Sequence, residues 1–129
     1  MAIRIVRLGS DREADEGLRI GTVRRPPRGV RKDEYASKNL YDVWFPNLSP
    51  SEDLLKEFFP IEDDPKRWRS FTRRFHAEMK RPEAARVLDV LAALSHQTDF
   101  SIGCYCENEV FCHRSLLREL LQTRGALVV

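Results

Sequence analysis

The stretch Phe100–Leu117, FSIGCYCENEVFCHRSLL, decides the fold, because an apolar segment gives way there to a polar loop and then to leucines. The apolar run predicts a buried strand over Thr98–Cys106. The leucines recur at helical spacing and predict a helix over Cys112–Thr123, with Gly125 just past its end. Strand ends and helix N-termini converge at such junctions in α/β proteins, and ligands bind there. We therefore expect this junction to carry any chemistry that the protein performs.

Three earlier segments have the pattern of strands. Ala2–Leu8 alternates isoleucine with arginine, and Leu18–Val23 is a second short run of this kind. Tyr41–Phe45 is an aromatic and β-branched run that predicts a third strand or an extended segment, which Pro46 ends. Between the second and third runs, the two prolines and the glycine of Arg24–Gly29 exclude a regular element and predict a rigid turn.

Three helices are expected between the third strand and the final one. Prolines mark their starts, at Ser49-Pro50, Asp64-Pro65 and Pro82. Apolar positions then recur at steps of three and four, which puts them on one face of each helix. The side chains expected to face the core are Leu54, Leu55 and Phe58 in the first helix, Trp68, Phe71, Phe75 and Met79 in the second, and Ala84, Val87, Leu88, Leu91 and Leu94 in the third.

This order of elements predicts the α/β class, with a small, mostly parallel sheet flanked by helices. We expect residues 1–129 to form a single compact domain, since no linker, repeat or low-complexity tract divides them. No apolar run is long enough for a membrane helix, so no membrane partner is expected. The three cysteines imply no disulfide framework. Without a signal peptide, the chain is expected in the cytoplasm.

Charge is distributed unevenly along the chain. The net charge of +2, from 22 basic and 20 acidic residues, is too small to predict a nucleic-acid partner on its own. However, the segment from Arg19 to Lys32 contains no acidic residue, and its rigid turn lowers the entropy cost of presenting arginines to phosphate, nucleotide or nucleic-acid backbone. The alternative is a solvated loop that pairs with the acidic stretches at 52–53 or 62–64. The central arginines of the segment are Arg24, Arg25 and Arg28.

A second basic surface is expected on the outer face of the helix that includes Lys66–Arg81. Such a face can bind nucleic acid or an acidic partner, but it is more often a solvated face, and we favour that interpretation here. The aromatic residues on the opposite side, Trp68, Phe71 and Phe75, are assigned to the core and not to base stacking.

The junction contains all three cysteines, with His113 and Arg114 directly after Cys112. Free N–H groups at the start of the predicted helix favour an anion, which His113 and Arg114 would also contact. A thiolate at this place would have a lowered pKa, so Cys106 or Cys112 could be a nucleophile with help from His113. The alternative is that Cys104 and Cys106 are small buried strand residues whose side chains point to the same face.

Two more specific chemistries are disfavoured by spacing. The junction lacks the spacing of a phosphatase loop, because seven residues separate Cys106 from Arg114 and one separates Cys112 from Arg114. The cysteines and His113 offer the number and types of ligand that zinc takes. Their spacing is nevertheless unlike the paired knuckles of zinc-binding sequences, so we assign no metal site and no cofactor.

These patterns predict a protein that binds an anionic ligand, which would be a nucleotide, a phosphorylated metabolite or a nucleic-acid backbone. The basic turn and the junction would meet if both follow strands of one sheet. The predicted ligand-binding residues are Arg24, Arg25, Arg28, His113 and Arg114. The alternative is a cysteine-dependent enzyme that acts on a nucleotide or phosphoester, so the sequence leaves open whether the protein is an enzyme. The catalytic candidates are Cys112, His113 and Cys106.

Several blocks occur in an order that resembles a known family. They are Arg24, Pro27–Lys32 (PRGVRK), Asp42–Trp44, Leu48–Ser51 (LSPS), Arg67-Trp68 with Phe71, Arg74 and Glu78, and Cys112–Arg114. In these blocks, from about Gly17 onward, the chain resembles the domain-of-unknown-function 488 family of small bacterial and archaeal proteins. The resemblance implies a compact α/β domain with no established activity. Val23 and Pro26 stand where family members commonly carry Asp and Trp, so any activity that depends on that aspartate would be absent here.

Overall fold

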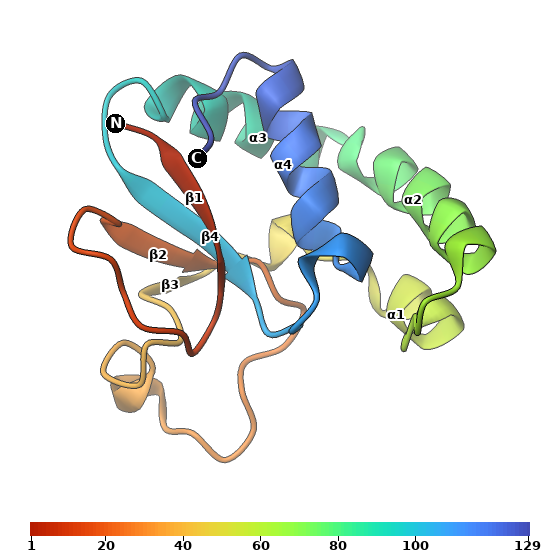
Figure 1. Cartoon of the computed structure of the whole chain (residues 1–129), viewed down its shortest axis with the longest axis horizontal. Helices are drawn as coiled ribbons and strands as arrows, with labels where there is room; N and C mark the ends of the chain where they lie inside the picture. Colours follow the sequence, from red (N-terminus) through yellow and green to blue (C-terminus); the bar gives the residue numbers. More distant parts are fainter.

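The strand β4, Phe100–Cys104, lies inside a four-stranded sheet in the computed structural model, which describes residues 1–129. All five residues of β4 are buried. The sheet order is β1 (Ile3–Arg7), β4, β2 (Leu18–Gly21) and β3 (Val43–Trp44), and every neighbouring pair is parallel (Figure 1). The predicted buried strand and parallel sheet are therefore confirmed, and each strand is shorter than the segment that predicted it.

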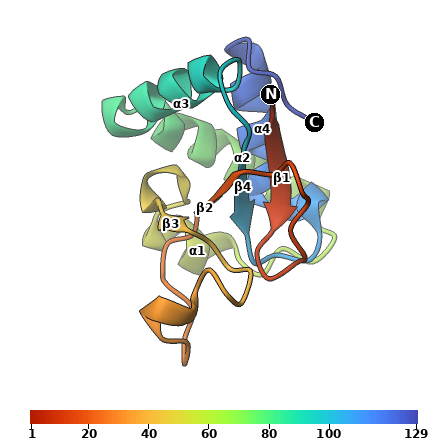
Figure 2. The ribbon, with the colours of Figure 1, turned by 90° about the vertical axis from the view of Figure 1, so that its left-hand side faces the viewer.

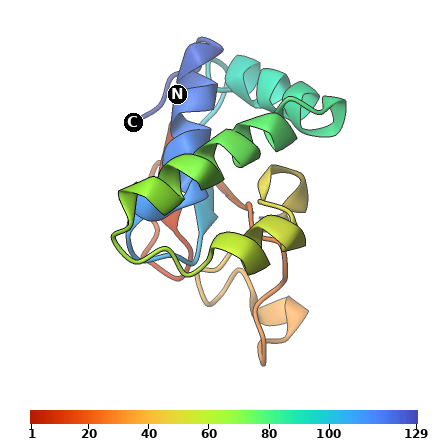
Figure 3. The ribbon, with the colours of Figure 1, turned by 90° about the vertical axis from the view of Figure 1, so that its right-hand side faces the viewer.

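The helices all lie on the same side of the sheet (Figure 3). They are α1 (Glu52–Phe58), α2 (Pro65–Met79), α3 (Pro82–Leu94) and α4 (His113–Thr123). Short 3₁₀ turns are formed by η1 (Lys32–Glu34), η2 (Pro46–Leu48) and η3 (Glu109–Phe111). None of the helices combines the length and the apolar character that crossing a membrane requires.

Two of the three predicted helix starts agree with the structure. The carboxylate of Asp64 caps α2, and Pro82 is the first residue of α3. The predicted start of α1 is wrong, because Ser51 is the cap, and its Oγ accepts a hydrogen bond from the N–H of Leu54 at 3.3 Å. Ser49 instead follows the last residue of η2 and is already part of that turn's hydrogen bonding, so α1 begins later than predicted.

A hydrophobic core of 18 buried residues fills the space between the sheet and the helices. Ile20 and Ile102, which are register partners on adjacent strands, contribute to it from the sheet. From α2, Phe71 packs against four other aromatic rings at centroid distances of 5.0–5.9 Å. Leu94 was predicted to join this core but is 41% exposed, because helical geometry puts it at the edge of the buried stripe of α3.

The opposite face of the sheet carries a buried polar network. Arg19 and Ser101 are register partners that alternate with the isoleucines of the core face, so they point away from the helices. Arg19 is 0% exposed and pairs with Glu16 at 2.7 Å. Ser101 Oγ also donates to Glu16, and Asp42 accepts the backbone N–H of Arg19. Arg19 is therefore not part of an exposed basic run, which begins instead at Arg24.

Candidate functional site

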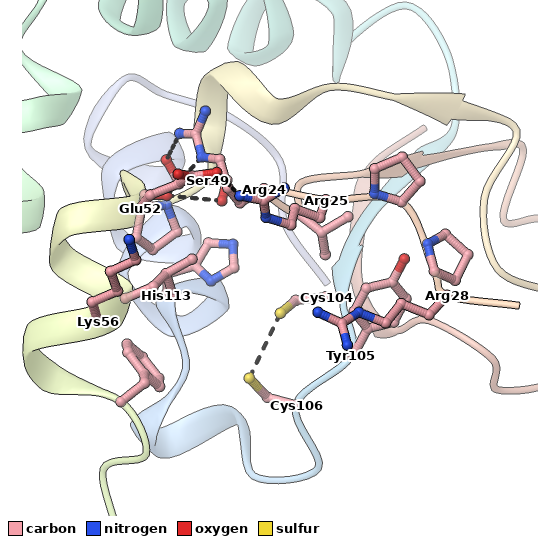
Figure 4. Close-up of a pocket in the computed structure, with 16 residues that line it drawn as sticks. Arg24, Arg25, Arg28, Ser49, Glu52, Lys56, Cys104, Tyr105, Cys106 and His113 are labelled. Atoms are coloured by element: carbon pink, nitrogen blue, oxygen red, sulfur yellow. Dashed lines mark hydrogen bonds and ion pairs between the residues drawn. The ribbon is translucent and has the colours of Figure 1, made fainter.

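A pocket of about 550 Å³ opens at the carboxyl ends of β2 and β4 (Figure 4). One wall is the loop of residues 23–28, which begins the segment that leaves the sheet after β2 (orange in Figure 2). A second wall comes from α1 and its flanks, between residues 49 and 59. The third contains Cys104, Tyr105, Cys106 and His113. The basic turn and the strand-to-helix junction thus share one cavity, whose volume is in the range of about 300–1,000 Å³ that is usual for small-molecule sites.

Arg24 holds the 23–28 loop against the start of α1. Its Nε donates to the carbonyl oxygen of Pro50 and its Nη2 to that of Ser49, each at 3.0 Å. Arg25 forms an ion pair with Glu52 across the same side of the pocket. Both arginines therefore have partners within the protein, although their charges still contribute to the potential inside the pocket.

Arg28 on the loop wall and Lys56 on the α1 wall have no such partners. Both side chains line the pocket and both are exposed, and neither forms a hydrogen bond or an ion pair. In all, four cationic side chains and one carboxylate line the cavity: Arg24, Arg25, Arg28 and Lys56 against Glu52. Most of the charged side chains that line the cavity are therefore cationic, and two of these cations have no partner within the protein.

His113 begins α4 and is held in place by the end of β2. Its Nε2 lies 2.7 Å from the carbonyl oxygen of Thr22, so Nε2 carries a hydrogen and donates it. Its Nδ1 then faces the Sγ of Cys112 at 3.8 Å. Burial disfavours the imidazolium, but the neighbouring Cys112 sulfur outweighs it and raises the pKa of His113. One ring edge of His113 is thus anchored to the sheet, while the residue itself lines the pocket.

Arg114, which was also predicted to bind the ligand, is buried and does not line the pocket. Its Nη2 donates to the carbonyl oxygen of Cys106 at 2.6 Å, which fixes the loop after β4. Its Nε is buried without any hydrogen-bond partner, and no carboxylate pairs with its guanidinium. Arg114 is therefore a buried cation without a counter-ion among the side chains.

The three cysteines meet at the bottom of the junction. Cys104 ends β4, Cys106 lies in the following loop, and Cys112 caps α4. Their Sγ atoms all lie within 4.8 Å of one another, and those of Cys104 and Cys106 are 3.6 Å apart (Figure 4). The strand is too short to include Cys106, so the closeness of the first two sulfurs comes from the loop and not from strand alternation.

The pKa values of the three thiols are shifted in different directions. Hydrogen bonds from Cys104 and Cys106, with help from the charge of His113, lower the pKa of Cys112. Hydrogen bonds to Cys104 and Cys112, together with burial, raise the pKa of Cys106. For Cys104, a hydrogen bond with Cys106 favours the thiolate, but the hydrogen bond with Cys112 and burial outweigh it and raise its pKa to about 12. The thiol that ionises most readily is the one that is 0% exposed.

The structure brings most of the predicted site residues together. Of the predicted ligand-binding set, Arg24, Arg25, Arg28 and His113 line the pocket. Of the catalytic candidates, Cys106 and His113 line it, whereas Cys112 is fully buried. The roles of these residues in binding or catalysis stay predictions.

Three lining residues were not singled out from the sequence: Lys56, Phe59 and Tyr105. Lys56 follows Glu52 by four positions, a spacing that places both on one face of α1, and this signal could have found it. The Tyr105 hydroxyl is buried without a hydrogen-bond partner. Burial, followed by the effect of neighbouring Tyr41, raises the pKa of Tyr105, so its hydroxyl stays a neutral donor.

Fold and pocket together define a parallel-sheet α/β protein with a cavity at its strand ends. The chain belongs to the DUF488 proteins: the family described as the active DUF488-N3 subclade matches residues 3–125, which confirms the resemblance seen in the sequence. Uncharacterised proteins of Mycobacterium tuberculosis and Mycobacterium bovis are each 26% identical to it over 122 residues, covering 95% of this chain and 95% of the relative. No solved structure matches the chain.

Proposed function

We propose that this protein binds a small anionic ligand, a nucleotide or phosphorylated metabolite, in the pocket between the 23–28 loop, α1 and the β4–α4 junction. The observation that carries the proposal is the pair of unpartnered cations, Arg28 and Lys56, on two walls of the same cavity. Charge-assisted hydrogen bonds from such groups to phosphate oxygens are stronger than neutral ones. Arg24 and Arg25 add positive potential, and the engaged Arg24 keeps the loop in position.

The remaining lining favours a ligand with an apolar or planar part. Val23, Leu55 and Phe59 line the cavity together with the prolines of the loop. Sites for small molecules combine such apolar walls with a few polar groups that fix orientation. A nucleic-acid backbone, the third ligand class predicted from the sequence, is less well matched by a cavity than by an open basic groove.

A cytoplasmic location is part of this proposal. The three cysteines are free, and reduced thiols persist in that compartment. Nucleotides and phosphorylated metabolites are abundant there as well.

Calorimetric titration with ADP, inorganic phosphate and adenosine tests the proposal. We expect ADP to bind most tightly and adenosine least, because the phosphates supply the charge and the base supplies apolar contact. Arg28→Ala and Lys56→Ala should each weaken ADP binding by about tenfold or more, as expected for the loss of one charge-assisted hydrogen bond. Arg69→Ala and Lys66→Ala are matched controls, because both residues are exposed and lie on α2 away from the pocket lining.

The proposal is overturned if none of the phosphate compounds binds, or if the pocket variants bind ADP as tightly as the controls do. A short single-stranded oligonucleotide belongs in the same series. If it binds more tightly than ADP and with a steep salt dependence, the ligand is a nucleic acid and not a nucleotide.

A cysteine-dependent enzyme is the second candidate, favoured by the position of Cys106, which is partly exposed on the pocket wall. It requires one thiol that reacts rapidly at neutral pH. Rates of alkylation by iodoacetamide, read by mass spectrometry for each cysteine, test this requirement. Slow labelling at all three positions would contradict catalysis by a thiol and leave the binding proposal untouched.

A further inference from the structure

We propose that Cys104, Cys106 and Cys112 together bind one zinc ion, or a similar thiophilic d¹⁰ metal ion. All of the cysteines in the chain are in this cluster, although the sequence spacing argued against a metal site. The inference rests on the positions of the sulfurs and of Arg114. It does not depend on the anion-binding proposal.

The distances between the sulfurs match those of a metal-thiolate centre. A tetrahedral site with Zn–S bonds of about 2.3 Å has sulfurs about 3.8 Å apart. The Sγ atoms of Cys104 and Cys106 are 3.6 Å apart, and all three lie within 4.8 Å. Small side-chain rotations would therefore close the cluster around an ion. Thiolate ligands select soft ions such as Zn²⁺ over Mg²⁺ or Ca²⁺.

The backbone that carries the thiols is already fixed. The carbonyl oxygen of Cys104 accepts the N–H of Leu8 at 2.8 Å. Cys112 is held at the start of α4 by hydrogen bonds through its own N–H and carbonyl groups. Cys106 is fixed through its carbonyl oxygen by Arg114. Ordering of the ligands would thus cost little when the ion binds.

Arg114 provides an independent sign that negative charge belongs here. It is 4% exposed, its Nε has no partner, and no carboxylate pairs with it. A buried charge without a counter-ion is costly. Three thiolates and one divalent ion carry a net charge of −1, so the loaded cluster would supply the counter-ion that no side chain provides. Simple apolar packing of three neutral thiols would leave this cation uncompensated.

The fourth coordination position would face the pocket. His113 is not part of the sulfur group, and Thr22 holds its Nε2. Cys104 and Cys106 line the cavity, so the remaining ligand would be a solvent molecule or a donor atom of whatever the pocket contains. Zinc sites that keep such an open position are those that act on substrates.

The test is an anaerobic titration of the reduced full-length protein with Co²⁺, followed by displacement with Zn²⁺. Co²⁺ replaces Zn²⁺ in thiolate sites and reports them through a thiolate-to-cobalt charge-transfer absorption. We expect this absorption to saturate at one equivalent and to disappear when one equivalent of Zn²⁺ is added. Absence of the charge-transfer band in the wild-type protein would overturn the proposal, whatever the variants do.

Single substitutions then assign the ligands. Cys106→Ser is the main variant, because Cys106 is only partly buried and lies outside the strands and helices. It should weaken Zn²⁺ binding by at least about 100-fold, since loss of a mere outer-shell partner already costs about 10–100-fold. Cys104→Ser and Cys112→Ser should behave in the same way where circular dichroism shows that they fold.

Two control variants distinguish metal binding at the thiol cluster from adventitious binding by histidine and from anion binding in the pocket. His96→Gln removes an exposed imidazole remote from the cluster and should leave Co²⁺ binding unchanged. Arg28→Ala should weaken ADP binding without changing Co²⁺ binding, which keeps the two proposals distinguishable. Cobalt binding that survives Cys106→Ser and is lost in His96→Gln would show adventitious histidine binding and contradict the proposed site.

Discussion

Two buried arginines, Arg19 and Arg114, have opposite surroundings. Arg19 is 0% exposed and forms two hydrogen bonds with the Glu16 carboxylate, at 2.7 and 2.8 Å. Further donors of Arg19 reach the backbone carbonyls of Ser10 and Asn39. Arg114 is 4% exposed, donates to one carbonyl, and has no carboxylate partner. The chain thus compensates one buried cation completely and the other hardly at all.

Arg19 has a structural role, whereas the thiol-site proposal gives Arg114 a functional one. The Glu16–Arg19 pair ties the loop after β1 to the outer face of the sheet, and its geometry leaves nothing for a ligand to add. Arg114 donates to the carbonyl oxygen of Cys106, one of the three clustered cysteines at the strand ends, where ligands of open α/β sheets bind. A cation that lacks its counter-ion in a buried place is a reason to look for a missing negative charge.

Removing the partner of Arg19 should produce the largest effect. Glu16→Ala leaves a buried guanidinium without its counter-ion, and we expect it to lower the free energy of unfolding by about 3–5 kcal/mol. Urea denaturation followed by circular dichroism measures this change. Glu57→Ala is the matched control, because its pair with Arg74 is half exposed and should contribute about 0.5 kcal/mol or less. Equal losses of unfolding free energy in the two variants would mean that the buried Glu16–Arg19 pair stabilises the fold no more than an exposed pair does.

Acidification should weaken the same network without a mutation. Burial opposes the ionisation of Glu16 and Asp42, but hydrogen bonds from Arg19 and Arg12 respectively outweigh it and lower both pKa values. The unfolded chain therefore binds more protons than the folded one between the unfolded pKa values, which are about 4.3 for Glu and 3.9 for Asp, and the lower pKa values of the folded protein. The stabilisation is complete above the unfolded values and is lost as the pH falls through the lower, folded values.

Urea denaturation between about pH 3 and pH 7 tests this prediction. The free energy of unfolding of the wild type should fall steeply on the acid side. The Glu16→Gln variant, which has no carboxyl group at this position, should show a shallower fall. Parallel curves for the two proteins would mean that Glu16 does not contribute to the pH dependence.

The fold was largely predictable because the decisive signals are local. The continuous apolar run of β4 and the aromatic stripe of α2 are periodic patterns that tertiary contacts reinforce. Asp64 marks the start of its helix through the hydrogen bond that its carboxylate accepts, and Pro82 through its fixed backbone angle. The predicted start of α1 at Ser49 was wrong because the two serines that flank Pro50 can each cap a helix. Only the 3₁₀ turn before them decides between the two.

The site was only partly predictable, because it depends on contacts between distant segments. Parallel strand ends had to bring the 23–28 loop near His113, and that part of the pocket could be anticipated. The burial of the Arg114 side chain could not be anticipated, since a basic residue in the first turn of a helix is usually exposed. The meeting of Cys112 with Cys104 and Cys106 also depends on how the loop after β4 folds back, which the spacing does not encode.

Two arginines that line the pocket show the same contrast between a partnered and an unpartnered cation, with smaller expected effects: Arg24 has partners and Arg28 has none. Arg24→Ala removes two hydrogen bonds to the carbonyls of Ser49 and Pro50, and should lower the free energy of unfolding by about 1.5–3 kcal/mol. Arg28→Ala removes an exposed side chain without partners and should change it by less than about 0.5 kcal/mol. Thermal or urea unfolding of both variants in ligand-free buffer measures the difference. A large loss for Arg28→Ala would show that its role is structural.

Replacing Arg114 should have a small effect on stability and the most specific effect on metal binding. In metal-free protein, Arg114→Met removes an uncompensated buried cation along with its hydrogen bond to Cys106, and these effects oppose each other. We therefore expect a change in the free energy of unfolding within about 1.5 kcal/mol, smaller than that of Glu16→Ala. Affinity for Zn²⁺ should fall by about 10–100-fold, because the loaded cluster loses its counter-ion. Strong destabilisation with unchanged Zn²⁺ affinity would place Arg114 with Arg19 as a structural cation, and would remove one of the two supports for the thiol site.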